Sequence, residues 1–543
     1  MNDSKKNNMV VQAGILAFAG IIVRVIGLLY NTPLVHIIKD EGFGYYDSAY
    51  AAYSIVLLIS SYSIPSAVSK VMAERLARKE YRNAYRVFVC SLIYVIVVGI
   101  AASCFVFFGA GILVKMESAI LPLKILAPTV FLSGILGVFR GFFQAQHTMV
   151  PTSVSQIIEQ IFNAVFSVVM AYILVKSATG TSPTYRASLG AAGSTIGTGI
   201  GVLSALVFIF IIYFYNRKNV MARIARDETK TLMPYPRIFL MILGVVTPFI
   251  VSTGIYNLNN FLDKTIYQII MLRGKEIAES VVAFDISAIA KGTKIANIPI
   301  AMASAMATTM IPKLAYHAAG GDTENVKDTI TRATRVTMYI SIPAAMGIGV
   351  LAKPIMRVIF PQPESLSLAS HMLIILAVTV MLYGLSTITQ AVLQSIGRMH
   401  APIFNAALSI VLHVIVMVVG MHFVPANKCI YVYAFATIFY AFCLCVLNGL
   451  SVKRHVGYNQ EIDKTFLRPL ICAVAMGLLT LGTYYLIYLT SGINIIALLV
   501  SLVIGVCSYF VLSIKWQVLG EDELLALPKG EFLLRVATKL RLI

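Results

Sequence analysis

Two lysines lie within an apolar stretch that is long enough to cross a lipid bilayer. Lys291 and Lys294 occupy the first half of residues 282–310, VAFDISAIAKGTKIANIPIAMASAMATTM. Residues three apart share one face of a helix, and an ammonium group inside a membrane is costly unless it faces water or an anion. This spacing predicts that both lysines line a solvated cavity and bind a negatively charged, membrane-borne substrate. The alternative is a span that begins near residue 295, with both lysines extended to the outer interface.

A third cation in a comparable position is Arg24, in AGIIVRVIGLLY, about two-thirds of the way along the first apolar stretch. All three cations are expected at a similar depth, in the outer half of the membrane. Three cations around one cavity favour a phosphate, pyrophosphate or carboxylate, and arginine can bind such a group through two parallel hydrogen bonds. The predicted substrate-binding residues are therefore Arg24, Lys291 and Lys294.

Four further charged residues in or near apolar stretches are candidates for a polar cavity wall or for ion coupling: Asp285, Glu159, Asp263 and Arg140. Asp285 precedes Lys291 by six residues. It is predicted either to compensate the charge of Lys291 or to couple transport to protons. For Glu159, in SQIIEQIFN, a polar contact between transmembrane helices is the alternative to a functional role.

Two prolines occur in similar contexts, YSIPSAVSK and NIPIAM. Pro65 and Pro299 each remove a backbone hydrogen bond and are predicted to bend a helix beside the cavity. A kink without functional consequence is the alternative, since prolines are ordinary in transmembrane helices.

The sequence contains no recognisable arrangement for covalent chemistry. Its eight histidines are scattered without an HExxH pattern, and no GxxxxGK phosphate loop followed by Ser or Thr occurs. The seven cysteines lie mostly in apolar runs without CxxC spacing and are interpreted as packing residues. We therefore expect no enzymatic activity, no metal and no bound cofactor, with transport driven by the membrane potential or by an ion.

Composition indicates an integral membrane protein. Of 543 residues, 58% are hydrophobic and 12% are charged, against roughly 25% charged residues in an ordinary soluble domain. The net charge of +19 does not indicate a nucleic-acid partner, because the basic residues lie between apolar runs. About fourteen transmembrane helices are predicted, near residues 10–32, 46–69, 87–109, 121–142, 151–175, 189–214, 239–261, 283–310, 336–352, 368–393, 403–424, 430–452, 469–490 and 493–514.

The charge of the connecting segments predicts the orientation. With an even number of helices, both termini lie on one side of the membrane. About 28 of the 43 lysines and arginines fall in segments on that side, against about 11 on the other. Because cytoplasmic loops carry the excess of positive charge, both termini are predicted to be cytoplasmic.

The chain also repeats itself. Residues 125–145 align without a gap on residues 375–395 with eight identities, and in both copies a methionine and then a proline follow. The copies lie in the fourth and tenth predicted helices, so both cross the membrane in the same direction, as in halves related by an axis along the membrane normal. We predict an all-α fold with two six-helix lobes, two additional helices and a cytoplasmic tail, at residues 1–230, 237–452, 469–514 and 515–543.

The stretch FRGFFQAQHTMVPTSVSQIIEQ, residues 139–160, resembles the signature of polysaccharide-biosynthesis membrane proteins of the stage V sporulation protein B type. These proteins belong to the multidrug, oligosaccharide-lipid and polysaccharide exporter superfamily, which includes the lipid II flippases of MurJ type. AGIIVRVIGLLYNTPLVHIIKDEGFGYY resembles the family's first helix and following loop, and IPIAMASAMATTMIPKLA, residues 298–315, its eighth helix. The resemblance covers essentially the full chain.

This resemblance implies alternating access between two lobes in a bacterial plasma membrane. The implied substrate is an undecaprenyl-pyrophosphate-linked sugar, above all the peptidoglycan precursor lipid II, and the implied partners are this lipid-linked saccharide and membrane lipid. Arg24 matches the arginine of the family's first-helix motif. Lys294 falls near the position of a cavity arginine five residues before the helix proline, here Pro299. The chain lacks the paired arginines after the second-helix proline, since Pro65 is followed by Ser-Ala-Val.

Other functions make different demands on the sequence. A cation-coupled multidrug exporter of the same superfamily would favour an acidic cavity, whereas the predicted cavity is cationic. A flippase for another lipid-linked polysaccharide fits the same residues. A membrane-embedded glycosyltransferase or polymerase would need a large external loop with paired carboxylates or a metal motif, and the predicted external loops are short.

Overall fold

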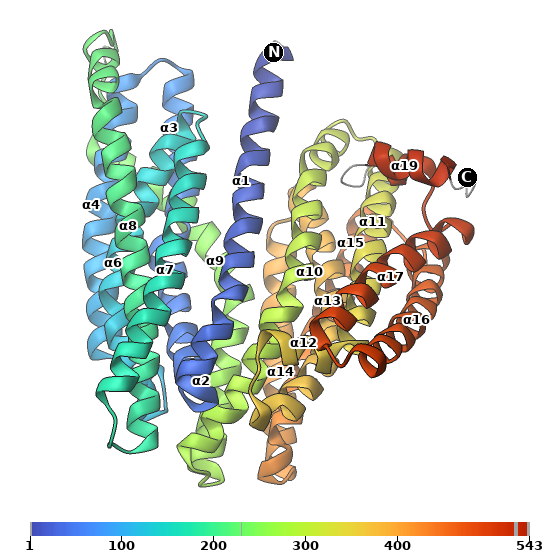
Figure 1. The fold of residues 1–543 in the computed structure, drawn as a ribbon. Helices are drawn as coiled ribbons and strands as arrows, with labels where there is room; N and C mark the ends of the chain where they lie inside the picture. The colour runs from blue at the N-terminus through green and yellow to red at the C-terminus, as the bar shows by residue number, and fades with distance from the viewer. Residues whose placement is uncertain (1–2, 230, 526–529, 540–543) are drawn as a thin grey trace. The chain divides into compact units, whose positions relative to one another are not determined.

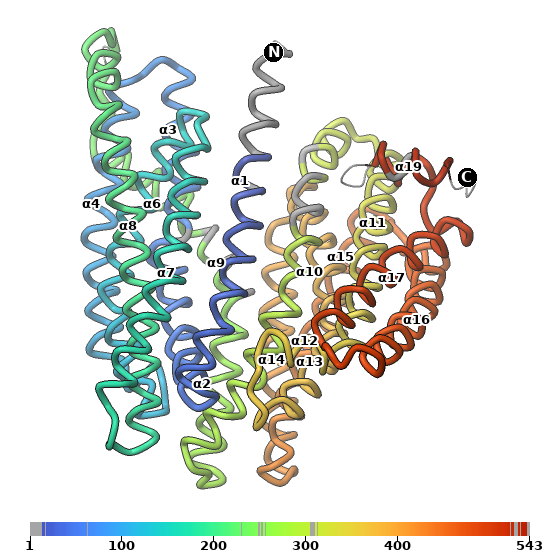
Figure 2. The backbone as a smooth tube through the Cα atoms, in the orientation of Figure 1, coloured from blue at the N-terminus to red at the C-terminus, as the bar shows by residue number. Residues whose placement is uncertain are grey.

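A computed structural model describes residues 3–229, 231–525 and 530–539, and no β-strand occurs within these ranges. Figures 1 and 2 show the path of the chain, coloured from blue at the N-terminus to red at the C-terminus. The chain forms two compact units, Met1–Ser287 (unit 1) and Ala288–Ile543 (unit 2). Their boundary falls within helix α10 (Glu279–Ala319).

Unit 1 consists of long helices joined by short elements. The long helices are α1 (Asp3–Leu29), α2 (Asn31–Leu57), α3 (Ile64–Ala77), α4 (Tyr81–Phe108), α6 (Ile120–Ala145), α7 (Val150–Ser177), α8 (Pro183–Ala225), α9 (Tyr235–Ile269) and the first residues of α10. The short elements are η1 (Leu58–Tyr62), α5 (Ala110–Leu113), η2 (Glu117–Ala119) and η3 (Ile270–Gly274). Helix α6 is central, because it contacts α2, α3, α4 and α8.

Aromatic rings fill the space between α4, α6 and α8. Phe88, Phe139, Phe142 and Tyr213 are buried, and their ring centroids lie 4.9 to 5.6 Å apart. Aromatic pairs of this kind contribute about 0.5–1.5 kcal/mol each beyond the area they bury. This cluster therefore fixes α6, which carries the first copy of the internal repeat.

Glycines in α8 allow its backbone to approach α7 closely. Gly193, Gly197 and Gly201 follow the spacing of small residues that is typical of packed transmembrane helices. A Cβ atom at Gly197 would lie 2.2 Å from the backbone nitrogen of Ser167. The Ser167 hydroxyl donates a 2.8 Å hydrogen bond to the Ser194 carbonyl. Close packing and this bond hold α7, which carries Glu159, against α8.

Unit 2 continues with a second set of long helices. They are the remainder of α10, α11 (Thr323–Val350), α13 (Pro363–Ser395), α14 (His400–Phe423), α15 (Cys429–Val456), α16 (Arg468–Ser491) and α17 (Asn494–Lys515). Shorter elements are α12 (Ala352–Ile359), η4 (Ala426–Lys428), η5 (Asp463–Leu467), α18 (Glu521–Leu525) and α19 (Gly530–Lys539). Helix α13 contacts both α11 and α15. Helix α16 pairs with α17 (Figure 2) and also contacts α11.

The fourteen predicted spans coincide with these helices. Ten helices within the described ranges are long and apolar enough to cross a membrane, and the pair α11–α12, bent by 77°, would be an eleventh. The other three predicted spans lie in α1, α9 and α10. The structure does not describe every side chain of these three helices. The predicted polytopic all-α membrane fold is confirmed.

Helix boundaries agree with the internal duplication. Helix α6 ends at Ala145 and α13 at Ser395, which pair in the ungapped alignment, and the next helices begin at Val150 and His400, which also pair. The two compact units differ from the lobes predicted by the repeat, since α9 and the start of α10 belong to unit 1. The sequence repeat reflects a duplication, whereas the compact units reflect which helices pack together. The predicted lobe boundary therefore remains a prediction.

Candidate functional site

Lys291 is completely buried in unit 2, with 0% of its surface exposed. Its Nζ atom donates a hydrogen bond to Oγ of Ser365, 2.8 Å away, and lies 5.7 Å from the centre of the Phe360 ring. Phe360 directly follows α12, and Ser365 lies in the first turn of α13. Lys291 therefore anchors the connection between these two helices to α10, and in this conformation its ammonium group does not face a water-filled cavity. Direct binding of substrate by Lys291 remains a prediction.

The other two predicted cations are more accessible. Lys294 is half-buried on α10 in unit 2, and Arg24 is exposed on α1 in unit 1. Because α10 begins at Glu279, both lysines lie within the helix and not in the loop that precedes it. The three cations are thus divided between the two units. Their binding of one anion remains a prediction.

An ion pair joins α6 to α7 inside unit 1. Arg140 Nη2 donates to Oε2 of Glu159 at 2.7 Å, and Arg140 Nε donates to Oγ of Ser155 at 2.9 Å. The Arg140 and Glu159 side chains are 14% and 30% exposed. Each charge compensates the other, as a partly buried ion pair requires. This ion pair is a polar contact between two helices, which is the alternative to a functional role that the sequence analysis gave for Glu159.

A second group of polar side chains, which we call the outer cluster, joins α2 to α9. It lies at the end of unit 1 that the charge pattern predicts to face the outside. Lys264 Nζ lies 2.5 Å from Oδ2 of Asp47, and these side chains are only 8% and 11% exposed. One turn before Lys264, Asn259 Nδ2 donates to Oδ2 of Asp263 at 3.0 Å. Asp263, one of the predicted coupling or cavity residues, lies buried in this cluster.

Two more carboxylates complete the outer cluster with contacts to α10. Asp285 accepts a 2.5 Å hydrogen bond from the Tyr267 hydroxyl, and the Ser287 hydroxyl donates to Asp40 at 3.1 Å. In the structure the partner of Asp285 is thus Tyr267 of the neighbouring helix α9. The role of Asp285 in compensating Lys291 or in proton coupling stays a prediction.

Helix α2 reaches α10 through an unusually close backbone contact. A Cβ atom at Gly44 would lie 2.0 Å from the carbonyl oxygen of Ala283. Just before this contact, α2 is kinked at Lys39, whose φ of 59° and ψ of −174° lie outside the helical region. A non-glycine residue in this conformation costs about 1–3 kcal/mol. Surrounding contacts, including that of Asp40 with Ser287, must hold the kink in place.

Replacing Gly44 with alanine is therefore expected to destabilise unit 1 by about 1–3 kcal/mol, the usual cost of overpacking a tight interior. The measurement is the melting temperature of the purified protein in detergent. Gly482→Ala is the matched control, because no atom lies within 4 Å of a Cβ built at Gly482. A Gly44→Ala variant that melts with the wild type would contradict the contact between α2 and α10.

The two prolines behave differently. Pro65 lies in the first turn of α3, directly after the π-helical segment η1. Glycines of α6 accommodate this turn: a Cβ atom at Gly141 would lie 2.8 Å from the Pro65 carbonyl oxygen. Helix α10 instead continues through Pro299 to Ala319 without a break. Hinge motion at either proline remains a prediction.

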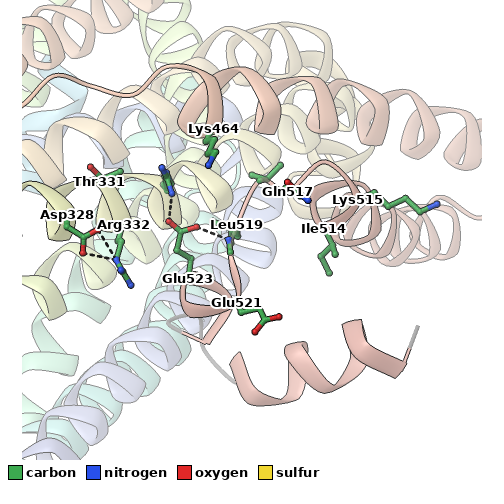
Figure 3. Close-up of a pocket in the computed structure, with 13 residues that line it drawn as sticks. Asp328, Thr331, Arg332, Lys464, Ile514, Lys515, Gln517, Leu519, Glu521 and Glu523 are labelled. Carbon is green, nitrogen blue, oxygen red and sulfur yellow. Dashed lines mark hydrogen bonds and ion pairs between the residues drawn. The ribbon is translucent and has the colours of Figure 1, made fainter. Parts of the chain in front are cut away.

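A cavity of about 680 Å³ lies in unit 2 between α11, η5 and the segment that follows α17. Figure 3 shows Glu523 of α18 and Lys464 of η5 at its wall. Arg335 of α11 donates a 2.7 Å hydrogen bond to Glu523 and pairs with Glu461 at 2.5 Å. Both acidic and basic side chains line this cavity. The three predicted substrate-binding residues, Arg24, Lys291 and Lys294, are not among its lining residues. It is a separate feature of the C-terminal segment.

Asp40, Lys264 and Tyr267 are residues of the outer cluster that sequence reasoning missed. The seventh predicted span ends at residue 261 and leaves Lys264 in a loop, whereas α9 continues to Ile269. The available signal is the run NLNNFLDK, in which polar side chains recur with helical spacing past the apolar window. Such a run indicates a helix that continues with a buried polar face.

Comparison with known proteins identifies relatives over most of the chain. Residues 59–503, more than half of the sequence, match the family described as lipid II flippase MurJ. The chain is 22% identical over 484 residues to lipid II flippase MurJ of Bacillus subtilis (strain 168), which covers 86% of each chain. It is 22% identical over 406 residues to stage V sporulation protein B of the same organism, covering 72% of this chain and 74% of that protein.

Solved structures share the fold. Lipid II flippase MurJ in an inward closed conformation superposes with a TM-score of 0.61 at 15% identity, covering 94% of this chain and 98% of that structure. An inward-facing MATE multidrug resistance transporter of the MOP superfamily gives a TM-score of 0.62 at 16% identity, covering 80% and 98%. With the family match extending over residues 59–503, the chain belongs to the MurJ family of lipid II flippases.

Proposed function

We propose that this protein is a flippase that moves an undecaprenyl-pyrophosphate-linked saccharide, with lipid II as the leading candidate, from the inner to the outer leaflet. The observation that supports this most directly is the match of residues 59–503 to the MurJ family. Movement occurs by alternating access between two lobes in a bacterial plasma membrane, with both termini in the cytoplasm. No bond in the substrate is made or broken.

The three cations are proposed to have different roles, because their side chains differ in solvent exposure. Arg24 is exposed and Lys294 is half-buried, so these two are proposed to bind the pyrophosphate. Lys291 is proposed to act as a positioning residue, because its ammonium group holds Ser365 at 2.8 Å. The membrane potential acts on each charge with about 2.3 kcal/mol per 100 mV. An inside-negative potential would thus favour return of the empty, cationic protein.

The proposal is tested by depleting the protein in its own bacterium and measuring which lipid-linked precursor accumulates in the inner leaflet. Accumulation of lipid II is the expected result. Accumulation of another lipid-linked saccharide would keep the flippase and change its substrate. If no precursor accumulated and overexpression instead raised drug resistance, the protein would be a cation-coupled multidrug exporter and the proposal would fail.

A further inference from the structure

Four aromatic side chains form a row along α2. The ring centroids of Phe43 and Tyr46 are 6.0 Å apart, those of Tyr46 and Tyr50 are 5.8 Å apart, and those of Tyr50 and Tyr53 are 5.6 Å apart. Three of the rings are at most 2% exposed, whereas Tyr50 is 40% exposed. The buried rings therefore support one tyrosine whose ring is partly uncovered.

Polar contacts hold the buried part of this row in position. The hydroxyl groups of Tyr46 and Tyr30 lie 3.1 Å apart, and α2 packs against α7, which carries Asn163. Asn163 Oδ1 in turn accepts a hydrogen bond from Thr198 of α8 at 3.3 Å. A ring supported in this way loses little conformational freedom when a ligand packs on it, which favours binding.

The surroundings of the row are polar, although they lie within predicted transmembrane spans. Helix α7, which contacts both α1 and α2, carries Glu159 and Gln160, and both side chains are half-buried. A Cβ atom at Gly27 of α1 would lie 3.2 Å from Nε2 of Gln160. Arg24, exposed, precedes Gly27 by one helical turn. Unit 1 thus presents an aromatic ring, a carboxylate, an amide and a guanidinium group in one region.

This combination of groups is suited to a sugar attached to phosphate. The CH groups on the face of a pyranose ring pack on an aromatic ring, which offers an apolar surface with a polar hydroxyl at its edge. Amide and carboxylate oxygens accept hydrogen bonds from sugar hydroxyls, and guanidinium binds phosphate. Because Arg140 compensates the charge of Glu159 at 2.7 Å, this carboxylate does not oppose the approach of an anionic lipid.

We propose that Tyr50 stacks on the saccharide of the lipid-linked substrate, that Glu159 and Gln160 hydrogen-bond its hydroxyl groups, and that Arg24 binds the adjoining phosphate. This assignment rests on the proposed function and deepens it, because it gives unit 1 a part in recognising the sugar in addition to the pyrophosphate.

The test compares two probes on the full-length protein in nanodiscs: undecaprenyl pyrophosphate that carries its saccharide and bare undecaprenyl pyrophosphate. We expect the wild type to prefer the saccharide-bearing probe. Tyr50→Ala should weaken binding of that probe about 3- to 10-fold, the range of a lost ring contact, and leave the bare probe unaffected. Tyr50→Phe, which keeps the ring, should retain the preference. Tyr172→Ala removes another exposed tyrosine of unit 1, 53% exposed, and should change neither affinity.

The other possible outcomes distinguish a failure of the Tyr50 assignment from a failure of the proposed flippase function. If Tyr50→Ala weakened both probes equally or neither, or if Tyr50→Phe were as weak as Tyr50→Ala, stacking on the sugar would be refuted. If the wild type bound both probes without preference, the flippase would stand and the Tyr50 assignment would fall. If the wild type bound neither probe, the proposed function itself would fall.

Discussion

Replacing Lys264 with methionine is expected to lower the stability of the protein by about 3–5 kcal/mol, the usual cost of leaving one partner of a buried ion pair uncompensated. Lys264 Nζ lies 2.5 Å from Asp47, and both side chains are nearly inaccessible. Methionine has a similar length and fills the space, so the loss reports the charge and not a cavity. The measurement is unfolding of the detergent-solubilised protein by heat and by denaturant.

Two further variants make this result specific. Asp47→Asn combined with Lys264→Met removes both charges and should recover part of the lost stability, because no unpaired ion remains buried. Lys428→Met alters an exposed lysine and should leave stability unchanged. A Lys264→Met protein as stable as the wild type would show that the outer cluster is solvated. Because the repeat assigns α2 and α9 to different lobes, this ion pair would also have to open if the lobes separate on that side.

Replacing both Arg24 and Lys294 with alanine is expected to reduce transport about 100-fold or more. Hydrogen bonds to charged groups contribute about 1.5–3 kcal/mol each, and the double variant removes both accessible cations assigned to the pyrophosphate. The protein should still insert and fold, because neither side chain is fully buried. The measurements are rescue of a flippase-deficient strain and the rate of lipid translocation in proteoliposomes.

The matched control replaces two exposed lysines, Lys218 in unit 1 and Lys353 in unit 2, with alanine. This change removes the same net charge and should leave transport intact. Lys291→Met separates folding from binding: it should lower the melting temperature, since it deprives Ser365 of its buried partner. Full transport by the Arg24→Ala, Lys294→Ala protein would refute the cationic binding site.

The sequence was most informative about features that belong to single segments. Hydropathy over about 20 residues decides whether a helix is stable in lipid, and each predicted span lies in a helix of the structure. The position of Pro65 is likewise a local matter, because the first turn of α3 does not need the backbone donor that proline lacks. At Pro299 α10 continues without a break, and the predicted bend there stays a prediction. A bend there depends on the neighbours that pack around the freed carbonyl.

From the sequence alone, the all-α membrane fold, the duplication and the family resemblance could be determined, because composition, periodicity and motif order are carried by each segment. The tertiary structure alone decided the partners of the charged residues: Lys291 with Ser365, Asp285 with Tyr267, and Asp47 with Lys264. A buried charge is stabilised by whichever group lies within hydrogen-bond distance. That distance is set by how separate helices pack, which spacing along one helix cannot reveal.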